Sequence, residues 1–165
     1  MVQESLITDE ARAAIGRESE PTTGYEVSAH EIRRYCYAID DLSPRYVDEE
    51  HAKRTKNKGI VAPPLFFGIP FARDVPVAML NKDGTPQRSS GRPKLKAERV
   101  MAGGTEIEFF APLRPGDVLT SRSKIADIYE KVGRTGPMAF TVMETTYTNQ
   151  RGELVARDRT TSIAR

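Results

Sequence analysis

The residues most capable of chemistry lie in one short stretch, Asp41-Leu42-Ser43-Pro44-Arg45-Tyr46. An aspartate followed by a second polar side chain five positions later is the layout of a loop in which two groups face one substrate. The second position holds Tyr46, whose phenol has a pKa of about 10 in water and is a poor base at neutral pH. The stretch therefore has the spacing of a catalytic loop but lacks the histidine that proton transfer would favour.

The composition is that of one ordinary globular domain. The chain has 165 residues, of which 38% are hydrophobic and 29% are charged. This suits a single domain with one core and gives no indication of disorder. The 25 basic and 23 acidic residues leave a net charge of +2. No excess of positive charge is present to neutralise many phosphates, so we do not expect a dedicated nucleic-acid-binding protein.

Several common kinds of site are not expected. The single cysteine, Cys36, rules out an internal disulfide and is compatible with a reducing compartment, so we expect a cytoplasmic protein. No apolar run approaches the ~18 residues of a membrane span, and residues 1–16 lack the apolar block of a signal peptide. Two histidines and one cysteine are too few for a closed zinc site. Nucleotide-binding and hydrolase motifs are also missing, and we expect no metal and no cofactor.

Two helices should position the polar loop. Ser28 and Glu31 fit a capping box, in which both side chains satisfy free backbone amides at a helix start. A helix over 29–39 is predicted to place one apolar stripe toward the core. The stripe consists of Ile32, Tyr35, Cys36 and Ile39. After the loop, Asp48 is predicted to cap a short helix that runs to about Thr55.

The most apolar segment spans residues 61–72 and carries Pro63 and Pro64 near its start. Proline suits the first turn of a helix, where the missing amide costs nothing. Pro70 lies six residues after Pro64 and should kink or end the helix. We therefore expect a buried, distorted helix of moderate length.

The remaining segments divide into a polar beginning, a long loop and a series of strands. Residues 1–24 should form a polar lead-in that ends in a turn at 21–24, ahead of a domain over 25–165. Residues 81–98 should form a long loop. Turns are expected at 112–117 and 149–152, and strands over 105–110, 118–129, 138–147 and 153–164. Helices followed by an antiparallel meander indicate an α+β domain, with the apolar helix packed on the sheet.

Two of these segments resemble motifs of one family, the MaoC-like hydratases and dehydratases, which have the hotdog fold. The polar loop resembles the family's Gly-Asp-x-Asn-Pro-x-His, and Ile107 to Asp117 resembles its strand and turn ending in Pro-x-x-x-Gly-Asp. The resemblance extends from about Tyr25 to Ile163. It implies a single hotdog domain in which an antiparallel sheet wraps around a central helix. It also implies removal of water from a 3-hydroxyacyl thioester, or the reverse addition across the α,β bond. The thioester is carried by coenzyme A or acyl carrier protein.

The resemblance also assigns roles to residues. In the family, an aspartate and a histidine hold the water and move the proton, and a helix-start amide polarises the thioester carbonyl. Asp41 stands at the aspartate and Ser43 at a neighbouring asparagine, whereas Tyr46 stands at the histidine. Pro64 stands at the glycine that supplies the amide, and proline has no N–H. Losing one such donor costs ~10²–10³ in rate, and losing acid–base help costs ~10²–10⁴.

This pattern is similar to the non-catalytic subunits of heteromeric members, such as the A subunit of (3R)-hydroxyacyl-ACP dehydratase. It implies a subunit with a degenerate site that shapes the acyl channel beside a catalytic hotdog subunit, in a homodimer or a heterodimer. Two alternatives stay open. The chain could be a self-sufficient enoyl-CoA hydratase that uses Asp41 with a non-standard partner, or a module that binds acyl thioesters without chemistry.

Each candidate residue also has a plainer interpretation. Asp41 could be an ordinary residue of a turn, and Tyr46 a half-buried aromatic. His51 could reach the loop only if its helix folds back. Basic side chains near the motif and in the long loop, including Lys56, could contact coenzyme A phosphates, but such residues more often form a solvated surface. The predicted substrate-binding residues are Pro64, Leu65, Phe66, Phe67, Arg92 and Lys94.

Overall fold

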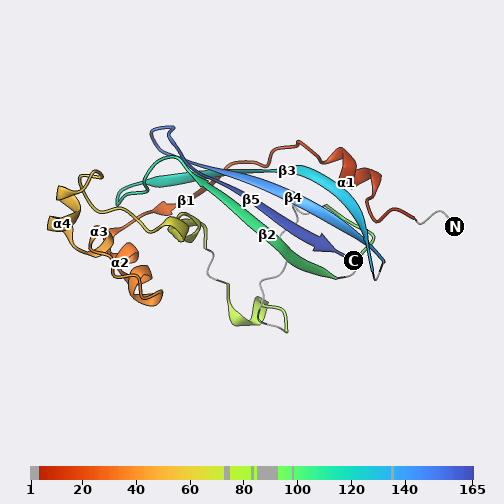
Figure 1. The fold of residues 1–165 in the computed structure, drawn as a ribbon, viewed down its shortest axis with the longest axis horizontal. Helices are drawn as coiled ribbons and strands as arrows, with labels where there is room; N and C mark the ends of the chain where they lie inside the picture. The colour runs from red at the N-terminus through yellow and green to blue at the C-terminus, as the bar shows by residue number, and fades with distance from the viewer. Residues whose placement is uncertain (1–3, 73–74, 83, 85–92, 98, 135) are drawn as a thin grey trace.

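The computed structural model describes residues 4–72, 75–82, 84, 93–97, 99–134 and 136–165, and shows one long antiparallel sheet (Figure 1). Its strand order is β1-β3-β4-β5-β2. The strands are β1 (Thr22–Glu26), β2 (Val100–Phe109), β3 (Val118–Gly133), β4 (Gly136–Asn149) and β5 (Leu154–Ala164). The α+β class and the four predicted strands are therefore confirmed, and β2, β3 and β4 are longer than predicted.

The helices gather at the two ends of the sheet. α2 (Ala29–Ala38), α3 (Pro44–Val47) and α4 (Glu49–Arg54) lie at one end, and α1 (Asp9–Ala13) lies at the other (Figure 1). Two short 3-10 helices are η1 (Pro64–Phe71) and η2 (Val77–Met79). None of the helices in the described part of the chain is long and apolar enough to cross a membrane.

Helix α2 begins where its capping residues predict. The Ser28 side chain accepts a hydrogen bond from the Glu31 amide, and the Glu31 carboxylate accepts one from the Ser28 amide. Ile32 and Cys36 are fully buried, but Ile39 is 48% exposed. The prediction that Ile39 belongs to the core stripe is wrong, because α2 ends at Ala38 and the chain turns away there. Asp48 caps α4 as predicted.

The expected central helix is short and of the 3-10 type. η1 starts at Pro64 and ends at Phe71, and its tighter i to i+3 hydrogen bonding accommodates Pro70 within it. Phe66, Phe67 and Pro70 are buried, so the apolar segment does pack on the sheet as predicted. The predicted distortion takes the form of a change in helix type.

The N-terminal residues contain structure that their polar sequence does not reveal. The turn predicted at 21–24 is wrong, because residues 22–24 belong to β1, which pairs with β3. A side chain at Gly24 would approach the Pro70 backbone to 2.9 Å, so only glycine lets β1 lie this close to η1. The loop predicted at 81–98 falls largely outside the described residues.

Two apolar clusters stabilise the sheet. The first core lies between the sheet and η1 and contains Ile32, Cys36, Tyr46, Phe66, Phe67, Leu119 and Val155, among others. The second core lies near the far end and contains Ile7, Ala11, Ile125, Ile128 and Ala139. Ile7 and Ala11 show that part of the predicted polar lead-in packs onto the sheet.

Candidate functional site

A cavity of about 390 Å³ opens beside the polar loop. Its walls come mainly from α3, from η1 with the residues before it, and from the end of β2 with the turn that follows, and they are completed by residues after α4 and on β5. A hollow with apolar walls and a few polar groups is the usual form of a small-molecule site. The residues around it include Arg45, Tyr46, Lys56, Asn57, Pro63, Pro64, Phe67, Phe109, Phe110, Leu113 and Val155.

Asp41 is held in place by the end of α2. Asp40 adopts the left-handed conformation with a φ of 56°, and the Asp41 amide donates to the Cys36 carbonyl at 3.0 Å. This is the backbone pattern that commonly ends a helix. The Asp41 carboxylate accepts a hydrogen bond from the Ser43 amide at 3.3 Å and so begins the loop as a local turn. Asp41 is only partly buried and is not part of the cavity wall.

Tyr46 forms part of the cavity wall and is only 7% exposed. Burial raises the pKa of its phenol, the neighbouring Arg45 guanidinium opposes this, and the charge of Asp41 adds to the rise. The Arg45 guanidinium lies 5.1 Å from the centre of the Tyr46 ring. Among the described residues, none forms a hydrogen bond with the Tyr46 hydroxyl. The phenol is therefore protonated at neutral pH and can donate a hydrogen bond, but it cannot act as a base.

Ser43 and Cys36 are occupied by other contacts. The Ser43 hydroxyl accepts a hydrogen bond from the Arg45 Nε at 3.0 Å. Burial, with a contribution from Asp41, raises the pKa of the Cys36 thiol. A protonated, buried thiol is a poor nucleophile. Neither side chain replaces the base that Tyr46 cannot provide.

The start of η1 offers no amide at the position where the resemblance requires one. Pro64 is the first residue of η1 and lines the cavity, and Pro63 before it also lines the cavity. Neither has an N–H to donate. The Pro63 carbonyl accepts the amide of Phe66 at 3.0 Å, which closes the first turn of the 3-10 helix.

The three apolar residues predicted to bind substrate have different surroundings. Phe67 lines the cavity, and its ring contacts those of Phe109 and Tyr147. Phe66 is fully buried and packs edge-on against Tyr35, away from the cavity. Leu65 is 59% exposed and is also absent from the cavity wall.

Of the two basic residues predicted to bind substrate, only Lys94 is among the described residues, and it does not line the cavity. Arg92 lies outside the described residues. Lys94 is exposed, and its carbonyl accepts a hydrogen bond from Thr8, just before α1. Figure 1 shows α1 at the opposite end of the sheet from α2, α3 and α4. The cations beside the cavity are instead Arg45 and Lys56.

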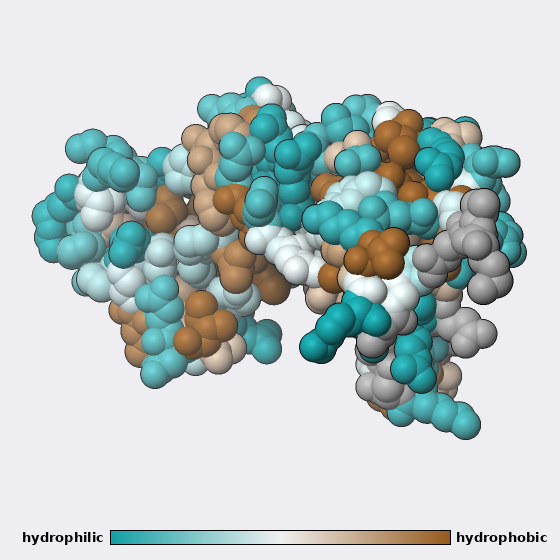
Figure 2. Space-filling view, turned by 45° about the vertical axis from the view of Figure 1, so that its right-hand side comes forward, coloured by the Kyte–Doolittle hydropathy of each residue, from teal (hydrophilic) through white to brown (hydrophobic). Residues whose placement is uncertain are grey.

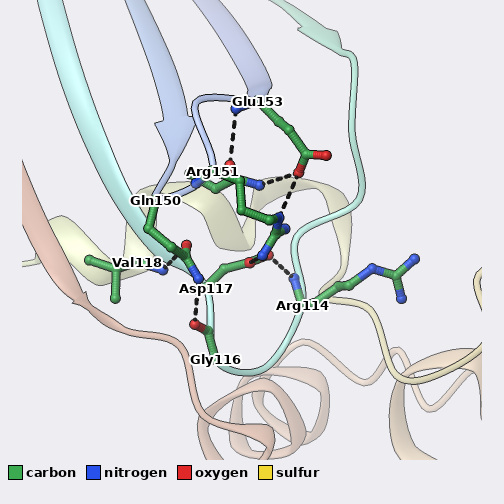
Figure 3. Close-up of polar contacts among 8 residues, drawn as sticks. Arg114, Gly116, Asp117, Val118, Gln150, Arg151 and Glu153 are labelled. Carbon is green, nitrogen blue, oxygen red and sulfur yellow. Dashed lines mark hydrogen bonds and ion pairs between the residues drawn. The ribbon is translucent and has the colours of Figure 1, made fainter.

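One wall of the cavity continues into a turn held by a buried carboxylate. Asp117, 1% exposed, accepts a hydrogen bond from the Arg114 amide at 2.8 Å and pairs with Arg151 at 3.0 Å (Figure 3). Gly116 has a φ of 85°, the left-handed region that favours glycine. The turn predicted at 112–117 is confirmed.

The β4–β5 hairpin completes this arrangement, which we call the Asp117 clamp. Gln150 donates to the Gly116 carbonyl at 3.0 Å, and Arg151 also contacts Glu153 at 3.0 Å (Figure 3). The Leu113 carbonyl in the same turn accepts the Ala62 amide at 2.8 Å. The clamp therefore joins the cavity wall, the hairpin at 149–152 and the start of η1.

Residues from the end of β2 were not predicted at the site. Phe109 and Phe110 are about half exposed and line the cavity. Their neighbours in sequence indicated only a strand, so no sequence signal distinguished them. Arg45 could have been found, because it lies within the polar loop itself. The described residues contain no group of histidine, cysteine, aspartate or glutamate side chains suited to holding a metal.

The sequence matches known proteins over most of its length. Residues 13–158 match the profile of the FAS1-like, dehydratase domain region. The chain is 33% identical to a UPF0336 protein of Streptomyces coelicolor over 123 residues, 74% of this chain and 75% of the relative. It is 32% identical to a probable enoyl-CoA hydratase alpha subunit of Thermomonospora curvata over 155 residues, 90% of this chain and 48% of the relative.

Solved structures share the fold. A chain of the ChsH1-ChsH2 complex from Mycobacterium tuberculosis superposes on this chain with a TM-score of 0.70 and 22% sequence identity. The match covers 89% of this chain and 83% of the other chain. A chain of the HadBC (3R-hydroxyacyl-ACP dehydratase) complex from the same organism superposes with a TM-score of 0.63 and 22% sequence identity. This match covers 92% of this chain and 97% of the other chain. The hotdog fold is therefore confirmed.

Proposed function

The chain belongs to the FAS1-like dehydratase family, and we propose that it is a subunit of a hydro-lyase acting on acyl thioesters. The complex would remove water from a 3-hydroxyacyl thioester or add it to an enoyl thioester, carried by coenzyme A or acyl carrier protein. This chain would shape the acyl channel, and a catalytic hotdog subunit beside it would supply the acid–base pair.

The observation that carries this proposal is the pairing of Tyr46 and Pro64 on the wall of one cavity. Abstraction of an α-proton from a thioester needs a base with a suitable pKa and a preorganised donor for the developing enolate oxygen. A buried phenol with a raised pKa stands in place of the base. A residue without an N–H stands in place of the donor. The cavity therefore lacks both chemical components at the positions where the resemblance places them.

The other residues of the cavity wall suit the binding of an acyl thioester. Phe67, Phe109 and Phe110 provide apolar surface for an acyl chain, and Arg45 and Lys56 provide positive charge at the cavity for an anionic carrier group. Such groups fix the position of a ligand without reacting with it. The ChsH1-ChsH2 and HadBC structures, which share the fold, are complexes, and this supports a role beside a second subunit.

The proposal is tested by assaying the purified chain alone for hydration of crotonyl-CoA. We expect a rate below that of an efficient hydratase by at least a factor of ~10². Robust turnover by the chain alone would refute the proposal and favour a self-sufficient hydratase that uses Asp41. Tight binding of acyl-CoA without turnover, even beside a catalytic hotdog subunit, would favour a binding module.

A further inference from the structure

A polar band crosses the inner face of the sheet between its two apolar cores. Inner face here means the side that packs on η1, to which Tyr147 presents its ring against Phe67 and Phe71. The band consists of Ser123 on β3, Thr145 on β4, and Asp158 and Thr160 on β5. Polar side chains on a face that is apolar on both sides require an explanation.

The strand register places Asp158 on this inner face. Tyr147 lies opposite Ala156, and Thr145 lies opposite Asp158. Side chains two residues apart on a strand share a face, as do directly opposite residues of neighbouring strands. Asp158 therefore faces the same side as Tyr147. On the other flank, Asp158 lies opposite Ile107, which packs against the first core.

Within the described part of the chain, Asp158 forms no ion pair, whereas several charges on the outer face do. Glu144 contacts both Lys124 and Arg159 at 3.0 Å, and Glu108 contacts Arg157 at 3.0 Å. The two arginines that flank Asp158 in the sequence thus point away from it. Among the described residues, the carboxylate has one hydrogen bond, from the Thr160 hydroxyl at 2.9 Å. A partly buried carboxylate with spare acceptor capacity is a place where a ligand can donate a hydrogen bond.

Tyr147 supplies a donor close to this acceptor. Burial, and then the charge of Asp158, raise the pKa of Tyr147 to about 12, so the phenol stays protonated. Its hydroxyl forms no hydrogen bond with any residue in the described part of the chain. A hydroxyl group between the two could donate to Asp158 and accept from Tyr147.

The band lies within reach of the cavity. Phe109 lines the cavity and lies opposite Ala156, in the same row of the sheet as Tyr147. Ile107, opposite Asp158, is two residues further along β2. At about 3.3–3.4 Å per strand residue, this step is roughly 7 Å. A chain that passes Phe109 and continues along the inner face therefore meets Asp158 next.

We propose that the polar band binds a hydroxyl group on the acyl chain of the substrate, remote from the thioester. This inference rests on the proposed function, because it assumes that an acyl chain enters through the cavity. It narrows the substrate class from acyl thioesters in general to those with an oxygenated acyl chain. The hydroxyl in question is additional to the one at the reacting carbon.

Binding of hydroxylated and plain acyl chains tests the proposal. Calorimetry would compare octanoyl-CoA with a series of hydroxyoctanoyl-CoA isomers, whose hydroxyl moves one carbon at a time toward the chain end. The protein is the full chain, measured alone and with a catalytic hotdog subunit added. We expect one isomer to bind about tenfold more tightly than octanoyl-CoA, since hydrogen bonds to a charged group are among the stronger ones.

Two variants identify the residue responsible. Asp158→Ala should abolish the preference for the hydroxylated isomer over octanoyl-CoA. Asp127→Ala removes an exposed carboxylate on the outer face and should leave the preference intact. Thermal melts would establish that both variants are folded. If a variant does not fold, the isomer series measured on the unaltered protein still tests the proposal.

The outcomes separate this inference from the proposed function. If octanoyl-CoA binds and every isomer binds equally well, the inference is overturned and the proposed function stands. If neither kind of acyl chain binds, whether carried by coenzyme A or by acyl carrier protein, both are overturned. If the preference exists but survives in Asp158→Ala, the assignment to the polar band is wrong.

Discussion

Tyr46 is a packing residue on the wall of the cavity. It belongs to the first core, and its hydroxyl has no hydrogen-bond partner among the described residues. A general base must lose its proton readily near the working pH, and burial moves the pKa of Tyr46 further from that range. The residue is therefore expected to matter for its ring and not for its oxygen.

This expectation predicts different results for two substitutions. Tyr46→Phe removes only the unbonded hydroxyl and should change the free energy of unfolding by less than about 0.5 kcal/mol. Tyr46→Ala removes a buried ring and should lower it by about 3 kcal/mol. Denaturant unfolding measures both values. In the complex with a catalytic subunit, Tyr46→Phe should leave the hydration rate within about a factor of two. A loss of ~10² or more in Tyr46→Phe would instead make Tyr46 a catalytic acid or base.

At the scale of elements, the Asp117 clamp fixes the wall of the cavity. It joins two turns that are separated in the sequence and, through the contact between Leu113 and Ala62, reaches the start of η1. A buried carboxylate that loses its charge leaves partner donors poorly satisfied. The clamp is therefore expected to contribute both to stability and to the shape of the cavity.

Asp117→Asn keeps the size of the side chain and removes its charge. We expect the free energy of unfolding to fall by about 1–3 kcal/mol, the usual range for a hydrogen bond to a charged group. Glu153→Gln is the matched control, because this carboxylate contacts the same arginine but is 54% exposed. It should cost clearly less than Asp117→Asn, because ion pairs between exposed groups contribute little. Equal losses in the two variants, measured by denaturant unfolding, would show that burial of Asp117 is not what matters.

Local rules explain which elements the sequence could predict. The start of α2, the caps of α4 and the turns at 112–117 and 149–152 each depend on a few neighbouring residues with specific backbone preferences. α1 and β1 were missed because their polar residues have no clear periodicity, and packing against β3 and the second core decides their structure. The type of η1 could not be predicted, because Pro70 indicates an interruption but not the form that it takes.

The candidate site was predictable only in part for the same reason. The polar loop and Pro64 have sequence motifs, and both contribute to the cavity wall through Tyr46 and Pro64. Phe109 and Phe110 join them only through the folding of the sheet. Lys94 was chosen for its charge, and the structure places it beside the segment before α1, where charge alone could not have located it.

At the scale of the whole molecule, the exposed edge of the sheet indicates where a second subunit could attach. β2 is the last strand in the sheet order and leaves one side without a strand partner in the described structure. Met101, Phe109 and Phe110, on β2 and just after it, are 40–51% exposed. Apolar patches also interrupt the hydrophilic surface in the view of Figure 2. An open edge with apolar side chains favours pairing with another chain.

A lysine on this edge should weaken association. Met101→Lys places a charge on β2 and is expected to raise the dissociation constant of the subunit complex by about tenfold or more. Val132→Lys is the control, since Val132 is 76% exposed but lies on β3, away from β2. Sedimentation equilibrium measures both. An unchanged dissociation constant in Met101→Lys, or an equal rise in both variants, would place the interface elsewhere.

The most direct test of the account is the hydration of crotonyl-CoA by this chain alone and then together with a hotdog subunit that carries an intact Asp-x-Asn-Pro-x-His loop. The chain alone should be nearly inactive, and the pair should be active. Asp41→Asn in this chain should leave the activity of the pair unchanged, whereas replacing the histidine of the other subunit should lower it by ~10² or more. Full activity of this chain by itself, abolished by Asp41→Asn, would contradict the account.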